Sequence, residues 1–379
     1  MGDVFEQTSN LVNPKEDEIE LWSLTVEDGL TKKSDRYNRE FLVKKDDNFK
    51  EVRPGDIVYN PMNMTLGAVG YNGMAKSVAV SGYYTTMVAK ENYDTYYINT
   101  WLKSPQAIRL YRTYATGSLI EKQRVQFPTL SIIPVTFPKY EEQIKIGSYF
   151  HSIDNLITLH QRKCEQTKKL KKYMLQKMFP QNGAKVPEIR FDGFTYDWEQ
   201  RKLGEFVKEG ILEAPLDGNH GEKHPTSDEY VDSGIPFLMA SDIHNGEVNI
   251  YSCKYITKER AERLDKGFAR NGDVLLTHKA TIGETAILSN LMTEYAMLTP
   301  QVTYYRIKNE ERLNREYLYS FFNSLDFQTE LKTKAAQSTR PYIGITAQQN
   351  LKIILPAEID EQIRIGLYFR NLDHLITLH

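Results

Sequence analysis

The sequence contains one phrase twice, EEQIKIGSYFHSIDNLITLH at 141–160 and DEQIRIGLYFRNLDHLITLH at 360–379. Thirteen of the twenty residues are identical, at a constant offset of 219. Upstream of each copy, RPGDIVYN (53–60) matches RNGDVLLT (270–277). The repeated unit is therefore much longer than the 20–50 residues of a solenoid repeat. It predicts two equivalent domains, each followed by the repeated phrase.

The stretch before each phrase mixes short β-like runs with helix-like runs. In the first copy, runs such as DIVYN (56–60) are separated by turn residues, and a helix-like run covers 95–114. A short strand is then expected in LSIIPVTFP (130–138), and its counterpart in LKIILP (351–356). These patterns predict compact α+β domains.

The repeated phrase itself predicts a long helix, because residues 141–178 contain no proline and apolar residues recur every three to four positions. At about 1.5 Å per residue, such a helix is roughly 55 Å long. Its copy, which starts at residue 358, is the expected packing partner, in an antiparallel coiled coil. His160 and His379 are equivalent in the repeat, and we expect a hydrogen bond in the helix seam rather than a catalytic role. The seam residues expected to pack, or to dock a partner, are Phe150, Ile153, Ile157, Leu170, Met174 and Met178.

Composition excludes several classes of protein. Hydrophobic residues make up 40% and charged residues 26%, as in globular proteins, and no run of 18 apolar residues could span a membrane. The polar start excludes a secretory signal. The two cysteines, Cys164 and Cys253, are far apart and lack zinc-ligand spacing, so we expect no metal, no cofactor and a reducing cytoplasm. The net charge is −2, so binding to nucleic acid would depend on local charge.

The repeated phrase, together with WEQRKL (198–203) before the second domain, resembles the specificity subunit of type I DNA restriction-modification systems. The resemblance covers the whole chain. It implies two target-recognition domains, each reading one half of a split, asymmetric DNA site, separated by long helices that set the gap between the halves. It also implies double-stranded DNA, two methyltransferase subunits and restriction subunits as partners. The chain itself would perform no catalysis, but would direct adenine-N6 methylation and cleavage.

On this resemblance the chain divides into five segments. The expected ranges are target-recognition domain 1 at 1–140, a central spacer helix at 141–180, a linker at 181–202, target-recognition domain 2 at 203–357, and an incomplete distal spacer helix at 358–379.

The loops 117–124 and 337–344 occupy matching places in the two domains and differ in sequence, as two different half-sites would require. Lysine and arginine bind phosphates, and arginine, lysine, asparagine and glutamine read base edges. The residues predicted to contact DNA are Arg112, Ser118, Lys122, Gln123, Arg124, Thr277, His278, Lys279, Ser338, Thr339, Arg340 and Tyr342. The alternative is that each of these residues lies on an ordinary solvent-exposed face. For the basic run 162–177, the alternative is the solvent-exposed side of the coiled coil.

Two other functions are open from the residues alone. One is a scaffold whose helices bind partners without reading DNA. The other is a self-contained DNA methyltransferase, since YNPMN (59–63) faintly resembles the Asn-Pro-Pro-Tyr motif of adenine methyltransferases. It lacks the second proline and the aromatic residue, and no glycine-rich cofactor loop follows a strand.

The second copy of the phrase stops at His379, the equivalent of His160, without a counterpart of residues 161–190. This pattern predicts a form truncated in its distal helix. It also predicts that Leu170, Met174 and Met178 lack a partner and are exposed, so that the chain self-associates or relies on the methyltransferase to cover them.

Overall fold

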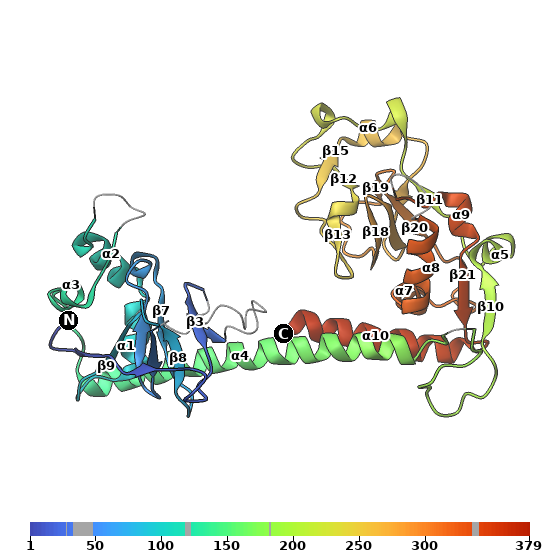
Figure 1. Ribbon diagram of the computed structural model, residues 1–379. Coiled ribbons are helices and arrows are strands. Elements are labelled where there is room, and N and C mark those ends of the chain that lie inside the picture. Colours follow the sequence, from blue (N-terminus) through green and yellow to red (C-terminus); the bar gives the residue numbers. More distant parts are fainter. Residues whose placement is uncertain (28, 33–47, 118–122, 182, 336–340) are drawn as a thin grey trace. The chain divides into compact units, whose positions relative to one another are not determined.

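The computed structural model describes residues 1–379 except 28, 33–47, 118–122, 182 and 336–340 (Figure 1). The chain divides into two compact units, Met1–Leu159 and His160–His379. Helix α4 (Tyr140–Lys177) contributes its first part to unit 1 and its second part to unit 2. No helix in the described part of the chain is long and apolar enough to cross a membrane.

Unit 1 is built on a four-stranded antiparallel sheet in the order β1-β9-β6-β7. These strands are β1 (Phe5–Thr8), β6 (Ile57–Tyr59), β7 (Val69–Tyr71) and β9 (Thr85–Ala89). Smaller sheets are formed by β2 (Leu11–Val12), β5 (Phe49–Val52) and β8 (Val78–Ser81), and by β3 (Trp22–Thr25) and β4 (Gly29–Lys32). The helices are α1 (Thr95–Leu102), α2 (Pro105–Tyr114) and α3 (Phe127–Ser131), with a 3₁₀ turn at Met64–Leu66.

Unit 2 contains the equivalent sheet, in the order β11-β20-β17-β18. Its strands are β11 (Leu216–Asp217), β17 (Val274–Lys279), β18 (Thr281–Ile287) and β20 (Val302–Tyr305). A second sheet has the order β15-β12-β19-β16, with β12 and β19 parallel: β12 (Ile235–Leu238), β15 (Lys254–Ile256), β16 (Phe268–Ala269) and β19 (Ala296–Leu298). Two strand pairs complete the unit, β13 (Ile243–His244) with β14 (Glu247–Val248) and β10 (Glu199–Lys202) with β21 (Lys352–Leu355).

The helices of unit 2 repeat the order found in unit 1. They are α5 (Leu203–Lys208), α6 (Lys258–Glu262), α7 (Arg315–Phe322), α8 (Leu325–Ala335), α9 (Ile345–Gln349) and α10 (Ile359–Leu378), with 3₁₀ turns at Gly221–Lys223, Ser227–Glu229 and Ala240–Asp242. Helices α7, α8 and α9 correspond to α1, α2 and α3. The predicted fold class is therefore confirmed: two pseudo-repeated α+β domains and a long helix.

The glutamine that both copies of the repeated phrase share attaches each domain to its helix in the same way. Gln143 accepts a hydrogen bond from the N-cap of α1, Asp94 N, at 3.1 Å and donates to Pro138 O at 2.8 Å. Gln362 accepts from the N-cap of α7, Asn314 N, at 3.0 Å and donates to Pro356 O at 3.1 Å. Both glutamines are buried. Buried polar groups need such partners, so the phrase is repeated because it forms the same joint twice.

The second part of α4 packs antiparallel to α10 within unit 2. His160 Nδ1 lies 2.9 Å from His379 Nδ1, and Lys171 forms an ion pair with Asp373. Residue numbers thus rise along α4 as they fall along α10. The expected hydrogen bond between the two equivalent histidines is confirmed.

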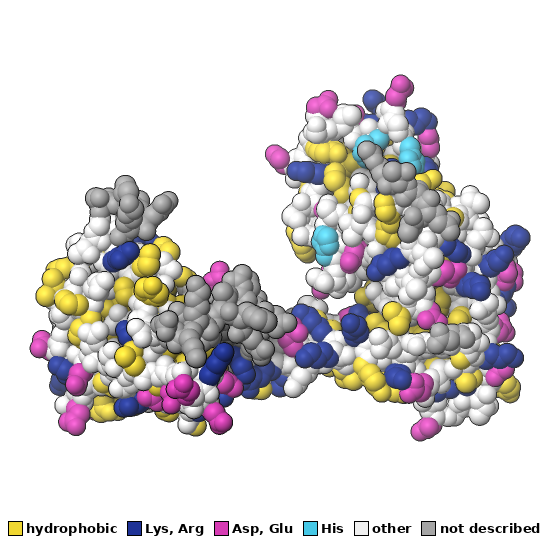
Figure 2. Space-filling model, in the orientation of Figure 1, with side chains coloured by type: hydrophobic (Ala, Val, Ile, Leu, Met, Phe, Trp, Pro, Cys, Tyr) yellow, Lys and Arg dark blue, Asp and Glu magenta, His cyan; other side chains and the backbone are white. Residues whose placement is uncertain are grey.

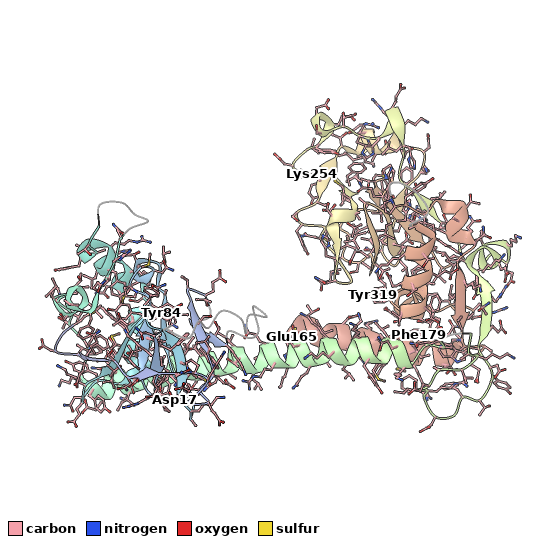
Figure 3. The ribbon with its side chains drawn as sticks, viewed as in Figure 1. Asp17, Tyr84, Glu165, Phe179, Lys254 and Tyr319 are labelled. Atoms are coloured by element: carbon pink, nitrogen blue, oxygen red, sulfur yellow. The ribbon has the colours of Figure 1, made fainter. Side chains whose placement is uncertain are left out.

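Phe179, just beyond α4, anchors this helix pair in the core of unit 2 (Figure 3). Its ring stacks on Phe369 of α10 at a centroid distance of 5.8 Å and contacts Tyr317 and Phe321 of α7 at 5.8 and 5.9 Å. Such aromatic contacts add to the stabilisation that comes from burying the rings.

Three expectations from the sequence are wrong in detail. Met178 is buried in the core of unit 2, which includes residues of α7 and α10, and Met174 packs against that core, although Leu170 remains 44% exposed. The helix-like run 95–114 is two helices, because Pro105 begins α2 and Ser104 caps it by accepting from Ala107 N.

The strand expected at 130–138 is also absent. Its counterpart β21 pairs with β10, whereas α3 extends to Ser131 and no strand in the described part of unit 1 pairs with the residues that follow. A strand needs a neighbour to bond its backbone groups, so the same apolar pattern forms a strand only in unit 2.

Candidate nucleic-acid interface

In unit 1, the predicted readers flank a loop that is closed by a short backbone ladder. Arg124 N donates to Thr116 O at 2.9 Å, and Thr116 N donates to Arg124 O at 3.0 Å. The Arg124 side chain is exposed and Gln123 is half-buried. Arg112 is exposed, and its Nε donates to Thr65 O at 3.3 Å. Ser118 and Lys122 lie outside the described residues.

In unit 2, the predicted readers gather at the end of β17. Lys279 is exposed and pairs through its backbone with Tyr342, which is 51% exposed. Thr277 is fully buried, and its hydroxyl accepts from Glu284 N at 3.0 Å. The predicted readers Ser338, Thr339 and Arg340 lie outside the described residues. His278 is only 3% exposed, and its Nδ1 lies 2.9 Å from Ile343 O, but its ring lines a cavity beside this corner. Lys279 and Tyr342 are therefore the two described side chains of this predicted set that are exposed at the surface.

The two sets of readers occupy equivalent corners of the two sheets. Val125 N donates to Pro61 O at 2.9 Å in unit 1, and Ile343 N donates to His278 O at 3.1 Å in unit 2. The strand-end residues 60–62 thus correspond to 277–279, and Arg124 corresponds to Tyr342. The same backbone corner presents different side chains in each domain.

Sequence reasoning missed a cluster of charged residues beside this corner of unit 2. Asp217, at the end of β11, is only 3% exposed, forms an ion pair with Lys266 and lies 2.7 Å from His220 Nε2. Burial alone would raise the pKa of the Asp217 carboxyl, but the hydrogen bonds from Lys266 and His220 outweigh it and lower that pKa. The turn sequence DGNH (217–220) places Asp217 and His220 close together and could have indicated part of this cluster. The ion pair between Asp217 and Lys266 depends on the tertiary fold and could not.

Basic and histidine side chains also gather on the surface. Figure 2 shows histidines grouped on one face of unit 2, and lysine and arginine along α4 and α10. Residues 141–190 hold ten basic and five acidic residues, against a net charge of −2 for the chain. Local positive charge of this kind attracts phosphates.

The predicted helix-packing residues have unequal environments. On the first part of α4, Phe150 and Ile157 are 40% and 50% exposed, and Ile153 is partly buried. Their equivalents in α10 include Phe369 and Leu372, which are buried in the unit 2 core. The exposed strip on α4, which also contains Tyr149 and Leu156, is a candidate surface for protein docking.

The resemblance of YNPMN to a methyltransferase motif has a structural explanation. Tyr59 is fully buried in β6, and Asn60 Oδ1 accepts from Met62 N at 3.0 Å in the turn that follows. Among the described residues, no group of three or more histidine, cysteine or acidic side chains could hold a metal ion.

Comparison with known proteins gives one family. Residues 196–379 match the family described as type I restriction modification DNA specificity domain. The chain is 24% identical, over 359 residues, to the type I restriction enzyme MjaVIII specificity subunit of Methanocaldococcus jannaschii, covering 91% of this chain and 79% of that protein.

Two solved structures share the fold over the whole chain. One is the S subunit of a type I restriction-modification system from M. genitalium, with a TM-score of 0.63, 14% identity and 89% of that chain covered. The other comes from work on complex assembly and conformational transition of the type I R-M system, with a TM-score of 0.52, 18% identity and 90% of that chain covered.

Proposed function

We propose that the chain is a specificity subunit of a type I restriction-modification system, since residues 196–379 match that domain family, and that it reads a split, asymmetric DNA site. In this role each unit binds one half-site, and the chain directs methyltransferase and restriction subunits to the DNA. The observation that carries the proposal is the same backbone corner, found in both units, with different side chains: Arg124 in one and Lys279 with Tyr342 in the other.

The reading residues proposed are those at these corners. Lys279, Arg124 and Arg112 are exposed cations that can contact phosphates or guanine edges, and Gln123 can contact adenine. Thr277 is better explained as a structural residue, since its hydroxyl is buried and already bonded. Two domains of one chain with unlike corners favour two unlike half-sites over a palindrome, because a palindrome is read by identical domains.

The partners proposed are two methyltransferase subunits, docked on the helices, and restriction subunits in the full complex. The exposed apolar strip of α4 supports a protein partner there, because a contiguous apolar patch on a helix usually marks an interface. The chain performs no catalysis itself and acts as a subunit of an adenine-N6 methyltransferase and endonuclease complex. The cytoplasm remains its predicted location. The domain ranges 1–140 and 203–357 stay predictions.

Single-molecule methylome sequencing tests the proposal. The chain is expressed with its methyltransferase subunit in a host free of DNA methylation. We expect N6-methyladenine in one new motif with two unlike halves and a fixed gap. Lys279→Ala should weaken methylation through the half read by unit 2, whereas Lys258→Ala, on the exposed helix α6, should not. A scaffold without DNA reading would give no motif although the methyltransferase is bound.

A further inference from the structure

A cavity of about 410 Å³ opens beside the reading corner of unit 2. Its walls include Asp217 and His278, with Lys266, Lys279 and Tyr342. Asp217 and His278 are each 3% exposed, so two titratable side chains are almost completely buried in the wall of a cationic cavity. Burying such groups costs free energy, and the positions therefore need an explanation.

His278 and Asp217 face each other as two hydrogen-bond acceptors. His278 Nδ1 lies 2.9 Å from Ile343 O, and because a carbonyl oxygen only accepts, Nδ1 carries the proton. Burial lowers the pKa of His278, which keeps the ring neutral near pH 7. Nε2 then holds a lone pair, has no partner among the described residues, and lies 3.9 Å from Asp217 Oδ2. Asp217 Oδ2 already has His220 Nε2 at 2.7 Å, but a carboxylate oxygen can accept a second hydrogen bond, so a donor between His278 Nε2 and Oδ2 would bond to both atoms.

The fold does not require this acceptor pair. In unit 1 the backbone position of His278 is taken by Pro61, as the hydrogen bonds of Val125 and Ile343 show. In unit 2, Asp217 of β11 lies opposite Thr303 of β20. In unit 1, Thr8 of β1 lies opposite Thr86 of β9, so the next residue, Ser9, occupies the position equivalent to Asp217. Unit 1 thus builds the same sheet corner from a serine and a proline. The acceptor pair therefore occurs in unit 2 and not in unit 1. This is the kind of difference expected if the two units read different half-sites.

We infer that this cavity accepts the exocyclic amino group of a DNA base, adenine N6 or cytosine N4, and so requires an amino-bearing base at one position of the half-site read by unit 2. The inference rests on the proposed function and names its substrate chemistry. A buried carboxylate repels phosphate but accepts hydrogen bonds from a base amino group. Lys266, whose side chain is 32% exposed, pairs with the other oxygen of Asp217, Oδ1, and together with Lys279 it can contact phosphate.

The test uses the chain assembled with its methyltransferase subunits and duplexes carrying its motif. Each adenine is replaced in turn by purine and each cytosine by 2-pyrimidinone, analogues that lack the amino group. We expect one position in one half to lose about tenfold in affinity, the lower part of the range for a base contact. The analogue that produces the loss distinguishes adenine from cytosine.

Two variants link that position to the cavity. His278→Asn keeps a donor for Ile343 O and removes the Nε2 acceptor, and Asp217→Asn removes the charge at nearly constant shape. In both, the analogue penalty should fall below about twofold, while Asp217→Asn raises affinity for non-specific DNA because a negative charge is gone. Asp265→Asn is the matched control: it removes an exposed acid of the same unit outside the cavity wall and should keep the penalty.

Several outcomes would overturn the inference. If no amino group in either half carries a penalty in the wild-type assembly, the cavity reads none, whatever the variants do. If the penalty persists in both variants, another residue accepts the amino group. If the wild-type assembly produces no split motif, the proposed function fails first and this inference with it.

Discussion

At the residue scale, Gly366 sets how closely α10 approaches the start of α7. A Cβ atom there would lie 2.8 Å from Tyr317 N and 2.9 Å from Glu316 C, both backbone atoms, so the helices would have to separate. Alanine gains about 1 kcal/mol in helix propensity, but overpacking costs typically 1–3 kcal/mol. We expect Gly366→Ala to lower the free energy of unfolding by up to about 2 kcal/mol, measured by urea denaturation. Asn371→Ala, exposed on the same helix, is the control, and equal effects from both variants would contradict the packing argument.

Also at this scale, His278 should make stability depend on pH. Its pKa in the folded state is lowered by burial below the ordinary value of 6.5, so the unfolded chain binds this proton more readily. The contribution of His278 to stability should therefore be constant above about pH 7 and fall as the pH drops below 6.5. His224, whose pKa burial also lowers, acts in the same direction. The urea midpoint of His278→Asn should be lower than that of the wild type at pH 7.5 but should fall less by pH 5.5. An unchanged pH dependence would show that His278 does not titrate in this window.

At the scale of elements, one phenylalanine of the repeated phrase has two environments. Phe369 is fully buried against Phe179, whereas its equivalent Phe150 is 40% exposed on α4. Phe369→Ala should cost about 3–5 kcal/mol in the unfolding of unit 2, as for other buried aromatic residues. Phe150→Ala should change stability by no more than about 0.5 kcal/mol, yet weaken methyltransferase binding measured by calorimetry if the α4 strip is the docking surface. Equal losses of stability at both positions would contradict the difference in burial.

The elements also show how far the sequence leads. The repeat and its 3–4 apolar spacing predict the two domains, the long helix and the His160–His379 contact, because these follow from local periodicity and internal symmetry. The strand at 352–355 forms, but its equivalent in unit 1 does not, because pairing with β10 decides it and pairing is not local. The acceptor pair of Asp217 and His278 could not be predicted either. The two residues are distant in sequence and meet only because β20 lies between β11 and β17.

At the scale of the whole molecule, α4 is the one element among the described residues that contributes to both units, so its length should set the gap between the half-sites. Seven helical residues inserted after Leu159 add about 10.5 Å and nearly two full turns, which preserves the helix face. One base pair rises about 3.4 Å, so the gap should lengthen by about three base pairs while both half-site sequences stay the same. Methylome sequencing measures the gap length and the two half-site sequences in one experiment. The same insertion after Met292, which is 98% exposed in a loop of unit 2, should leave the gap unchanged. Efficient methylation at the original gap by the Leu159 insertion would mean that contacts other than this helix hold the reading domains at their spacing.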